Sequence, residues 1–462
     1  MIVMDNTQSF YCDAKYQQGQ NIMKEMIRII PLLAICFLTF LTSTIKAEGG
    51  NSNNYLQSVI TAIDYHTRNI YLFNYENDKL IIINPFYEIP GWSEALPLQH
   101  TVVIPEVNKI FITTDNTKLF PSFIGVLKVN NIDWDKRKAE LELEDAIMLD
   151  TPDTPPLMAP VLPINNNQAI PNWLVGRGTQ IHGPTLLPGS DLLYHTEFTS
   201  DRVRVLNYKT NQLIAGVDPI VIENYTEQTH GVNFNNSGSI GLGTGYFFDN
   251  NIIDVYKPNK ITGELTPIGQ IKLGSEERYA ALTHFTYWLD ERYAVTATMQ
   301  LDKTSITPST TKEIIPPSVW LLDAIELTAT KIISSTDSDT GHGIYRSASD
   351  IAFANGKLYI AEEDSLHADE FGRDGFVSIF DLSDRYNPKF IKRLKPGPDL
   401  PKGFAVSHAL SPSPDERYML AASWVSGYVI KIDTATDKVV KIWGPSDGLV
   451  KPHGLFAAGN RR

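Results

Sequence analysis

A repeated unit of four short strand-forming segments constrains the fold of this 462-residue chain more than any other feature. In the last full copy, runs rich in apolar residues cover residues 409–412, 418–422, 428–433 and 438–443. Turn-forming sequences separate them, among them Ser426-Gly427 and Thr434-Ala435-Thr436-Asp437. Short apolar runs bounded by such turns are typical of β-strands, so the unit is predicted to be a four-stranded meander.

Copies of this unit recur along the chain, with openings near residues 100, 182, 230, 284, 350, 408 and 453. The shorter spacings between openings match a propeller blade of roughly 40–50 residues. The longer spacings contain insertions near residues 151–171, 304–317 and 362–374, which in a propeller belong in its loops. The third strand of a unit tends to end in Asp or Asn, whose side chain can bond its own backbone and begin the turn.

The two ends of the repeat complete one another. Residues 59–64, 69–73 and 80–83 have strand patterns but no histidine opening, whereas His453 opens a unit that has no blade after it. Joining these parts gives seven units and removes the free sheet edges that invite aggregation. The sequence therefore predicts an all-β fold, a seven-bladed β-propeller of four-stranded antiparallel blades that is closed by pairing of the N- and C-terminal strands.

Residues 1–47 are expected to be a leader that contains a signal peptide at about residues 23–47. Lys24 and Arg28 precede an apolar run from Ile29 to Leu41, and the small residue Ala47 follows, as in secretory signals. An uncleaved membrane anchor is the alternative, because residues 27–45 approach the roughly 20 residues that span a bilayer. We therefore expect an exported protein, periplasmic or secreted, with residues 48–462 as a single domain.

Charge and cysteine content narrow the classes of partner and of chemistry. The formal net charge of −13 disfavours binding to the phosphate backbone of a nucleic acid. Both cysteines, Cys12 and Cys36, lie in the leader, so the remaining chain has no disulfide, thiolate ligand or cysteine nucleophile. The expected partner is a small molecule, a cation or a protein.

Six of the ten histidines lie at the openings of the units. A circular repeat brings equivalent positions together around its axis, so these imidazoles are predicted metal ligands at the axial mouth. The predicted ligands are His100, His182, His230, His284, His408 and His453. Neutral imidazole suits copper and zinc, of which copper is preferred here. Six ligands are too many for one tetrahedral ion, so either more than one ion binds or some of the six only form hydrogen bonds.

Three further features have less specific interpretations. Asp350 takes the histidine place in the remaining unit and is either an oxygen ligand or a turn former. His195 and Glu197 share one face of a strand, where a packed histidine is favoured over an acid–base pair. Residues 238–245 are rich in glycine, but no helix follows them to bind a phosphate, so they are predicted to be a strand.

Residues 427–440 read Gly-Tyr-Val-Ile-Lys-Ile-Asp-Thr-Ala-Thr-Asp-Lys-Val-Val, and Pro452-His453-Gly454 follows them. Over roughly residues 350–460 the chain resembles the YVTN-type β-propeller repeat, which implies the fold and no particular activity. The axial histidines are loosely similar to those of the metal-binding propeller of nitrous oxide reductase, a multicopper enzyme. This chain lacks the cupredoxin domain of that family. It also lacks the cysteine motifs of selenium-binding proteins and methanethiol oxidases, which are propellers of similar length.

Three functions follow from these observations. The first is an exported propeller that binds a transition metal through histidines at the axial channel, with activity as a metal-dependent oxidoreductase. The second is a non-catalytic extracytoplasmic binding or scaffold propeller that recognises a protein or glycan through its loops. The third is a lactonase-like or isomerase-like enzyme with Ca²⁺ in the channel, disfavoured because that class usually places Glu, Asn and Asp at the axis.

Overall fold

The computed structural model describes most of the chain after residue 53. The described residues are 54–64, 66–92, 98–114, 123–148, 181–197, 202–214, 229–245, 252–274, 278–280, 283–298, 313–315, 317–334, 347–363 and 374–457. The expected leader and the insertion at residues 151–171 lie outside them. Among the residues described, no helix combines the length and the hydropathy needed to cross a bilayer.

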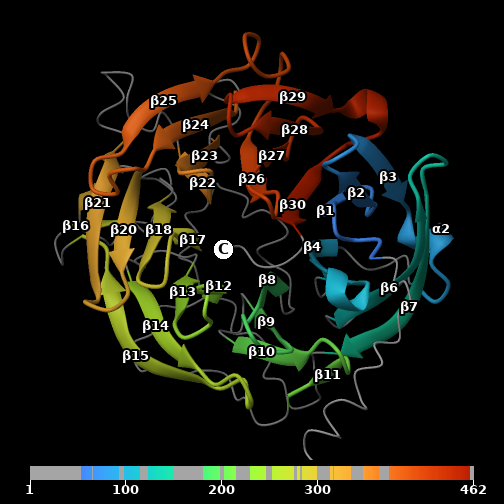
Figure 1. Ribbon diagram of the computed structural model, residues 1–462, viewed down its shortest axis with the longest axis horizontal. Helices are drawn as coiled ribbons and strands as arrows, with labels where there is room; N and C mark the ends of the chain where they lie inside the picture. The colour runs from blue at the N-terminus through green and yellow to red at the C-terminus, as the bar shows by residue number, and fades with distance from the viewer. Residues whose placement is uncertain are drawn as a thin grey trace, which may run out of the picture. The chain divides into compact units, whose positions relative to one another are not determined.

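The strands form seven four-stranded antiparallel sheets arranged as a ring (Figure 1), which confirms the predicted seven-bladed β-propeller. From the innermost strand outwards, blade 1 is β30 (Pro452–Ala457), β1 (Val59–Asp64), β2 (Ile70–Asn74) and β3 (Lys79–Ile83). Blade 2 is β4 (Leu98–Ile104), β5 (Lys109–Thr114), β6 (Phe123–Asp133) and β7 (Lys138–Met148). Blade 3 is β8 (Ile181–Leu186), β9 (Leu192–Glu197), β10 (Arg202–Asn207) and β11 (Gln212–Leu213).

The remaining four blades follow the same order. Blade 4 is β12 (Thr229–Phe234), β13 (Gly241–Gly245), β14 (Ile252–Pro258) and β15 (Leu265–Lys272). Blade 5 is β17 (Thr283–Trp288), β18 (Tyr293–Thr298), β20 (Ser318–Asp323) and β21 (Thr328–Ser334). Blade 6 is β22 (Ser347–Ala354), β23 (Lys357–Glu363), β24 (Phe376–Asp381) and β25 (Lys389–Leu394). Blade 7 is β26 (Ser407–Pro412), β27 (Tyr418–Ser423), β28 (Tyr428–Asp433) and β29 (Lys438–Trp443).

A few short elements lie outside the blades. They are the helix α2 (Pro85–Glu88), the 3-10 turns η1 (Pro105–Val107) and η3 (Pro445–Asp447), and the strands β16 (Arg278–Ala280) and β19 (Glu313–Ile315). β16 and β19 pair in parallel, so part of the insertion predicted at residues 304–317 is a strand. The glycine-rich segment at residues 238–245 was predicted to be a strand, and its second half forms β13.

Contacts between innermost strands close the ring. Each innermost strand contacts the next one, from β30 through β4, β8, β12, β17, β22 and β26 back to β30. Within blade 1, Ile60 pairs with Ala457 and Ile63 pairs with His453. The C-terminal strand therefore completes the N-terminal blade, as the sequence predicted.

Asp64 fastens this closure. Its carboxylate accepts hydrogen bonds from the hydroxyl of Tyr71 at 2.5 Å and from the backbone N–H of Lys451 at 2.7 Å. The backbone N–H of Thr67 donates to the other carboxylate oxygen at 2.6 Å. Burial acts to raise the pKa of Asp64, but these hydrogen bonds outweigh it and hold the pKa below its ordinary value. A charged side chain thus joins the end of β1 to the start of β30.

The turn between the third and fourth strands has the same construction in every blade. An Asp or Asn side chain at the end of the third strand accepts backbone N–H groups two or three residues further on. These residues are Asn74, Asp133, Asn207, Asn259, Asp323, Asp381 and Asp433. The prediction that Asp or Asn begins this turn is confirmed, and the mechanism is local backbone capping.

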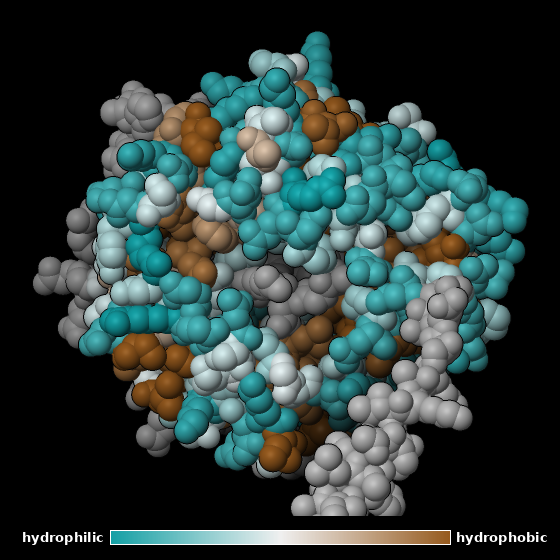
Figure 2. Space-filling view, viewed as in Figure 1, coloured by the Kyte–Doolittle hydropathy of each residue, from teal (hydrophilic) through white to brown (hydrophobic). Residues whose placement is uncertain are grey.

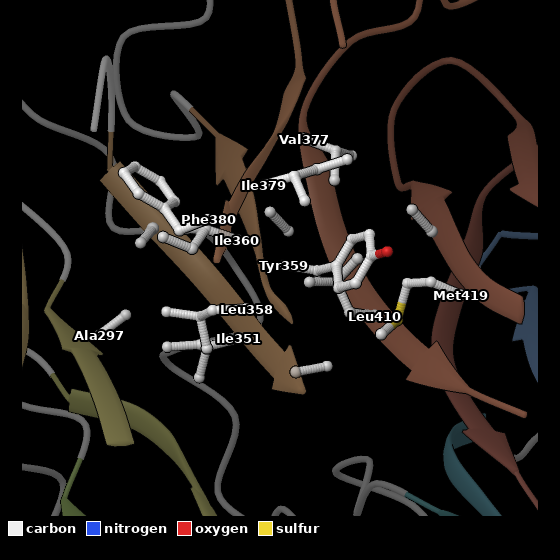
Figure 3. Packing of buried hydrophobic residues seen from close by; sticks show 14 of the residues in the cluster. Ala297, Ile351, Leu358, Tyr359, Ile360, Val377, Ile379, Phe380, Leu410 and Met419 are labelled. Atoms are coloured by element: carbon white, nitrogen blue, oxygen red, sulfur yellow. The ribbon is translucent and has the colours of Figure 1, made fainter. Parts of the chain in front are cut away.

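Apolar side chains from both faces of each blade form the core. In blade 6, Tyr359 points toward Leu410 and Met419 of blade 7, whereas Leu358 and Ile360 lie on the side of blade 5 (Figure 3). This alternation follows from the two-residue period of a strand. Because both faces of an inner strand are covered, the middle of β23 is a continuous run of largely apolar residues, Leu358 to Ala361.

The outermost strands meet solvent. Val440 and Ile442 of β29 are exposed, and Lys441 lies between them. Charged residues on an outer strand discourage pairing with another chain. In the view of Figure 2, hydrophilic residues cover most of the surface and the hydrophobic ones form separate patches.

Candidate metal site at the centre of the ring

Every innermost strand departs from regular pairing near its first residues. The register shifts beside this position in all seven blades. In blade 4 the ladder skips His230, and in blade 7 it skips His408. A bulge of this kind bends the strand and redirects the side chain that it carries. The histidines at the unit openings therefore lie at irregular points of the inner strands.

Three of the six predicted ligands come together, and we call them the axial histidine cluster: His100, His408 and His453. The ring of His453 lies between the other two, with its centroid 5.2 Å from that of His100 and 4.9 Å from that of His408. His100 is 4% exposed and His453 is 7% exposed, and His408 is half-buried. They come from β4, β26 and β30, the innermost strands of three consecutive blades.

A backbone carbonyl orients the central ring of this cluster. Nδ1 of His453 lies 3.2 Å from the carbonyl oxygen of Gln99. A carbonyl oxygen can only accept, so the proton is on Nδ1 and the lone pair is on Nε2. Gln99 is the residue that the ladder of blade 2 skips, because Leu98 pairs with Thr114 and His100 pairs with Thr113. His100 is therefore one position further along its strand than His408 is.

Trp424 borders the cluster and was not among the residues that sequence reasoning selected. Its ring centroid is 5.0 Å from that of His408 and 5.6 Å from that of His453. It directly follows β27, and its backbone N–H donates to Val406, just before β26. The sequence could have indicated Trp424 by its position, because it follows the second strand of a blade at the same end as the histidine opening.

Of the other three predicted ligands, the structure describes the side chain of His230 alone, and it packs against a neighbouring blade. His230 is 2% exposed, and its ring packs edge-on against Phe285 at 4.6 Å. Its carbonyl accepts a hydrogen bond from Thr196 at 2.8 Å, which links blades 3 and 4. His182 and His284 are the second residues of β8 and β17, but their side chains lie outside the described part of the structure.

Asp350 does not occupy the position that the sequence comparison gave it. In blade 6 the ladder skips Ser349, which therefore matches His408 of blade 7. The hydroxyl of Ser349 donates to the carbonyl of Ser407 at 2.7 Å. The Asp350 carboxylate accepts the backbone N–H groups of Ile351 and Leu410 at 2.9 and 2.8 Å. Asp350 thus joins blades 6 and 7, one position beyond the histidine place.

In the present orientation of its rings, the axial histidine cluster is not a preformed metal site. Among the described residues, no three His, Cys, Asp or Glu side chains are grouped so that they could hold a metal ion. The planes of His408 and His453 are only 27° apart, close to parallel. Terminal sp³–sp² torsions such as χ2 of histidine are broad, so ring orientation can change while the strands stay in place.

His195 is packed inside the fold, as the sequence favoured. It is fully buried in β9, and neither ring nitrogen has a hydrogen-bond partner among the described residues. Burial lowers the pKa of His195 to about 3, because a cation is costly where no water or partner solvates it. Its imidazole is therefore neutral at ordinary pH.

Comparison with known proteins supports the fold and no finer family. No protein-family model matches the chain, and no curated protein matches it. A hypothetical selenium-binding protein from Sulfolobus tokodaii is 12% identical, with a TM-score of 0.56 over 87% of this chain and 94% of that one. A functionally unknown protein from Desulfotomaculum acetoxidans is 12% identical, with a TM-score of 0.53 over 87% and 99%.

A third similar structure is a putative 6-phosphogluconolactonase from Bacteroides uniformis. It is 12% identical, with a TM-score of 0.52 over 86% of this chain and 99% of that one. Fold likeness at this identity does not carry activity from one protein to another. The chain is a seven-bladed β-propeller, and its function has to be argued from its own residues.

Proposed function

We propose that this propeller binds a transition-metal ion at the centre of the ring through His100, His408 and His453. The observation that carries the proposal is the spacing of the three imidazoles, whose neighbouring centroids are 5.2 and 4.9 Å apart. Three nitrogens each about 2.0–2.1 Å from a tetrahedral ion place ring centroids about 5 Å apart. The rings of His100 and His408 each lie near that separation from the ring of His453, which supports the proposal.

The tautomer of the central histidine supports the same proposal. A histidine that ligates a metal usually donates its other N–H to a carboxylate or to a backbone carbonyl. His453 has that arrangement, because its Nδ1 lies 3.2 Å from the carbonyl oxygen of Gln99. Binding then needs the rings of His100 and His408 to turn toward Nε2 of His453.

The donor set decides which ions fit. Three neutral imidazoles suit copper and zinc, and they leave a fourth position for water or substrate. Copper at such a site would supply one-electron chemistry, and zinc would supply a Lewis acid. With copper bound, the proposed activity is that of an oxidoreductase. The proposal also includes export of the protein, directed by residues 23–47. Fractionation of cells that produce the full chain tests the export.

Titration with Co²⁺, Cu²⁺ and Zn²⁺ tests the proposal on purified, metal-free protein. We expect one ion per chain, with absorption bands of an imidazole-bound ion in the Co²⁺ and Cu²⁺ complexes. His453→Phe and His408→Phe keep an aromatic ring in the cluster but remove a ligand nitrogen. Each is expected to weaken binding by at least about tenfold, or 1.4 kcal/mol.

The surface histidine His66 provides the matched control, because it is exposed and lies outside the cluster. His66→Ala should bind the ion like the unchanged protein. Equal affinity in His453→Phe, His408→Phe and the unchanged protein would contradict the proposal, because the ion would then bind elsewhere. No binding to the unchanged protein would also contradict it and would favour a metal-free binding module.

A further inference from the structure

A second candidate site lies at the opposite end of the blades from the histidines. A cleft of about 520 Å³ is lined by Asp290, Arg292, Tyr293, Ser383, Asp384, Arg385 and Tyr386. The first three residues come from the turn that follows β17 and from the start of β18, whereas His284 lies at the beginning of β17. The others come from the loop between β24 and β25, so the cleft spans blades 5 and 6.

An aromatic ring and two guanidinium groups shape this cleft. The guanidinium of Arg385 lies over the ring of Tyr293 at 4.4 Å, and that of Arg292 lies 5.2 Å from the same ring. The hydroxyls of Tyr293 and Tyr386 are 3.5 Å apart. Tyr386 is 50% exposed, so the cleft offers an apolar ring face beside several polar groups.

Both arginines of the cleft are already paired within the protein, and the carboxylate of Asp384 accepts hydrogen bonds from Asn387 and from the backbone N–H of Tyr386. Arg385 pairs with Asp290 at 2.8 Å, and Arg292 makes hydrogen bonds to both carboxylate oxygens of Asp323 at 2.6–3.0 Å. An anionic or cationic ligand would have to compete with these pairs. A neutral ligand does not, because its hydroxyls can donate to a carboxylate and accept from a guanidinium at once.

We infer that this cleft binds a neutral carbohydrate chain. Sugar hydroxyls match the mixed set of donors and acceptors, and the C–H face of a sugar ring matches the exposed ring of Tyr386. The cleft is open to solvent and not enclosed, so a sugar chain would lie along it. The inference is independent of the metal proposal, because no residue is shared between the two sites.

The chain contains an internal comparison for this cleft. The motif Asp290-Glu291-Arg292-Tyr293 recurs as Asp415-Glu416-Arg417-Tyr418 at the same place in blade 7. There the ammonium of Lys431 lies over the ring of Tyr418 at 4.2 Å and pairs with Asp78 of blade 1. A cation from the same blade thus occupies the face of Tyr418. Arg417 corresponds to Arg292 and lies outside the cleft, so it serves as the control for loss of an exposed arginine.

Binding of oligosaccharides to the full chain tests the inference. The probes are maltohexaose, cellohexaose, mannohexaose and chitohexaose, with hexagalacturonate as an acidic comparison and EDTA present to exclude metal effects. At least one neutral probe should bind with a Kd of about 1 mM or tighter, as measured by calorimetry or by ligand-observed NMR. Tyr386→Ala and Arg385→Ala should each weaken it by at least about tenfold, and Arg417→Ala should not.

Three results would overturn the inference. They are no binding of any neutral probe at about 10 mM, binding of hexagalacturonate alone, or binding that both cleft variants retain. Because Tyr386 is half exposed, Tyr386→Ala is expected to fold even where loss of Arg385 costs stability. EDTA keeps failure here separate from failure of the metal proposal.

Discussion

The imidazole of His408 lies beside that of His453, with ring centroids 4.9 Å apart and ring planes 27° apart. The two residues belong to blades 7 and 1, and the strand that carries His453, β30, pairs with the N-terminal strand β1. The contact therefore lies where the two ends of the propeller meet. Any change that unpairs the strands of blade 1 is expected to move the two rings apart and so to disrupt the proposed metal site.

The tautomer of His453 is the first testable consequence. Since the carbonyl of Gln99 accepts a hydrogen bond from Nδ1, the neutral ring should carry its proton on Nδ1. Long-range ¹H–¹⁵N NMR of the metal-free protein at alkaline pH distinguishes the two tautomers. A ring protonated on Nε2 would remove the tautomer argument for metal binding.

Metal affinity should depend on pH in one direction. Imidazole binds a metal only when neutral, so protons compete with the ion and affinity falls as the pH decreases. From about pH 8 to about pH 5 we expect the dissociation constant for Zn²⁺ to rise by at least about tenfold. Competition with a chromophoric chelator measures this dissociation constant. An affinity that does not change across this pH range would point to carboxylate ligands.

His195 should make stability depend on pH. Its pKa is about 3 in the folded chain, below the ordinary value of about 6.5. The unfolded chain therefore binds a proton that the folded chain does not, and the free energy of unfolding falls as the pH decreases below about 6.5. The contribution is about 1.4 kcal/mol per pH unit, lost progressively toward pH 3.

The variant His195→Leu isolates this effect. It removes the titrating group while keeping a side chain of similar size, so its free energy of unfolding should depend less on pH. Urea denaturation at several pH values between about 4.5 and about 7, for the variant and the unchanged protein, measures the difference. Parallel pH profiles would show that His195 is solvated or bonded in the folded protein.

Loss of the Asp64 charge should weaken the closure of the ring. Asp64→Asn removes charge-assisted hydrogen bonds to Tyr71 and Lys451, and we expect it to lower the free energy of unfolding by about 2 kcal/mol at neutral pH. Because the folded pKa of Asp64 lies below its ordinary value, this contribution is present above about pH 4 and is lost as the pH falls further.

The exposed carboxylate of Asp135 gives the control for that measurement. Its side chain is 91% exposed, so Asp135→Asn should change stability by less than about 0.5 kcal/mol. If Asp64→Asn unfolds at the same urea concentration as Asp135→Asn, Asp64 does not fasten the closure.

The fold could be predicted from the sequence because its determinants are local. Strand runs such as residues 428–433 and the Asp or Asn that begins each third turn specify a blade within a few residues. Even the shared blade was readable, because His453 opened a unit that residues 59–83 completed. The repeat carries this information many times over.

The candidate site was only partly predictable, because it depends on single-residue shifts. Spacing alone could not reveal that the ladder skips Gln99 and Ser349, which puts His100 and Asp350 one position beyond His408. Nor could it separate His230, which packs on Phe285, from the three histidines whose rings meet. Trp424 carried no motif, and only its place at the end of β27 relates it to the cluster.

Anomalous diffraction from crystals soaked with Cu²⁺ or Zn²⁺ tests the central claim most directly. Data collected at the absorption edge of the metal locate the ion without any assumption about its ligands. The account predicts one strong peak within bonding distance of Nε2 of His453 and of ring nitrogens of His100 and His408. A peak only at surface residues such as His66, or no peak at the centre of the ring, would contradict it.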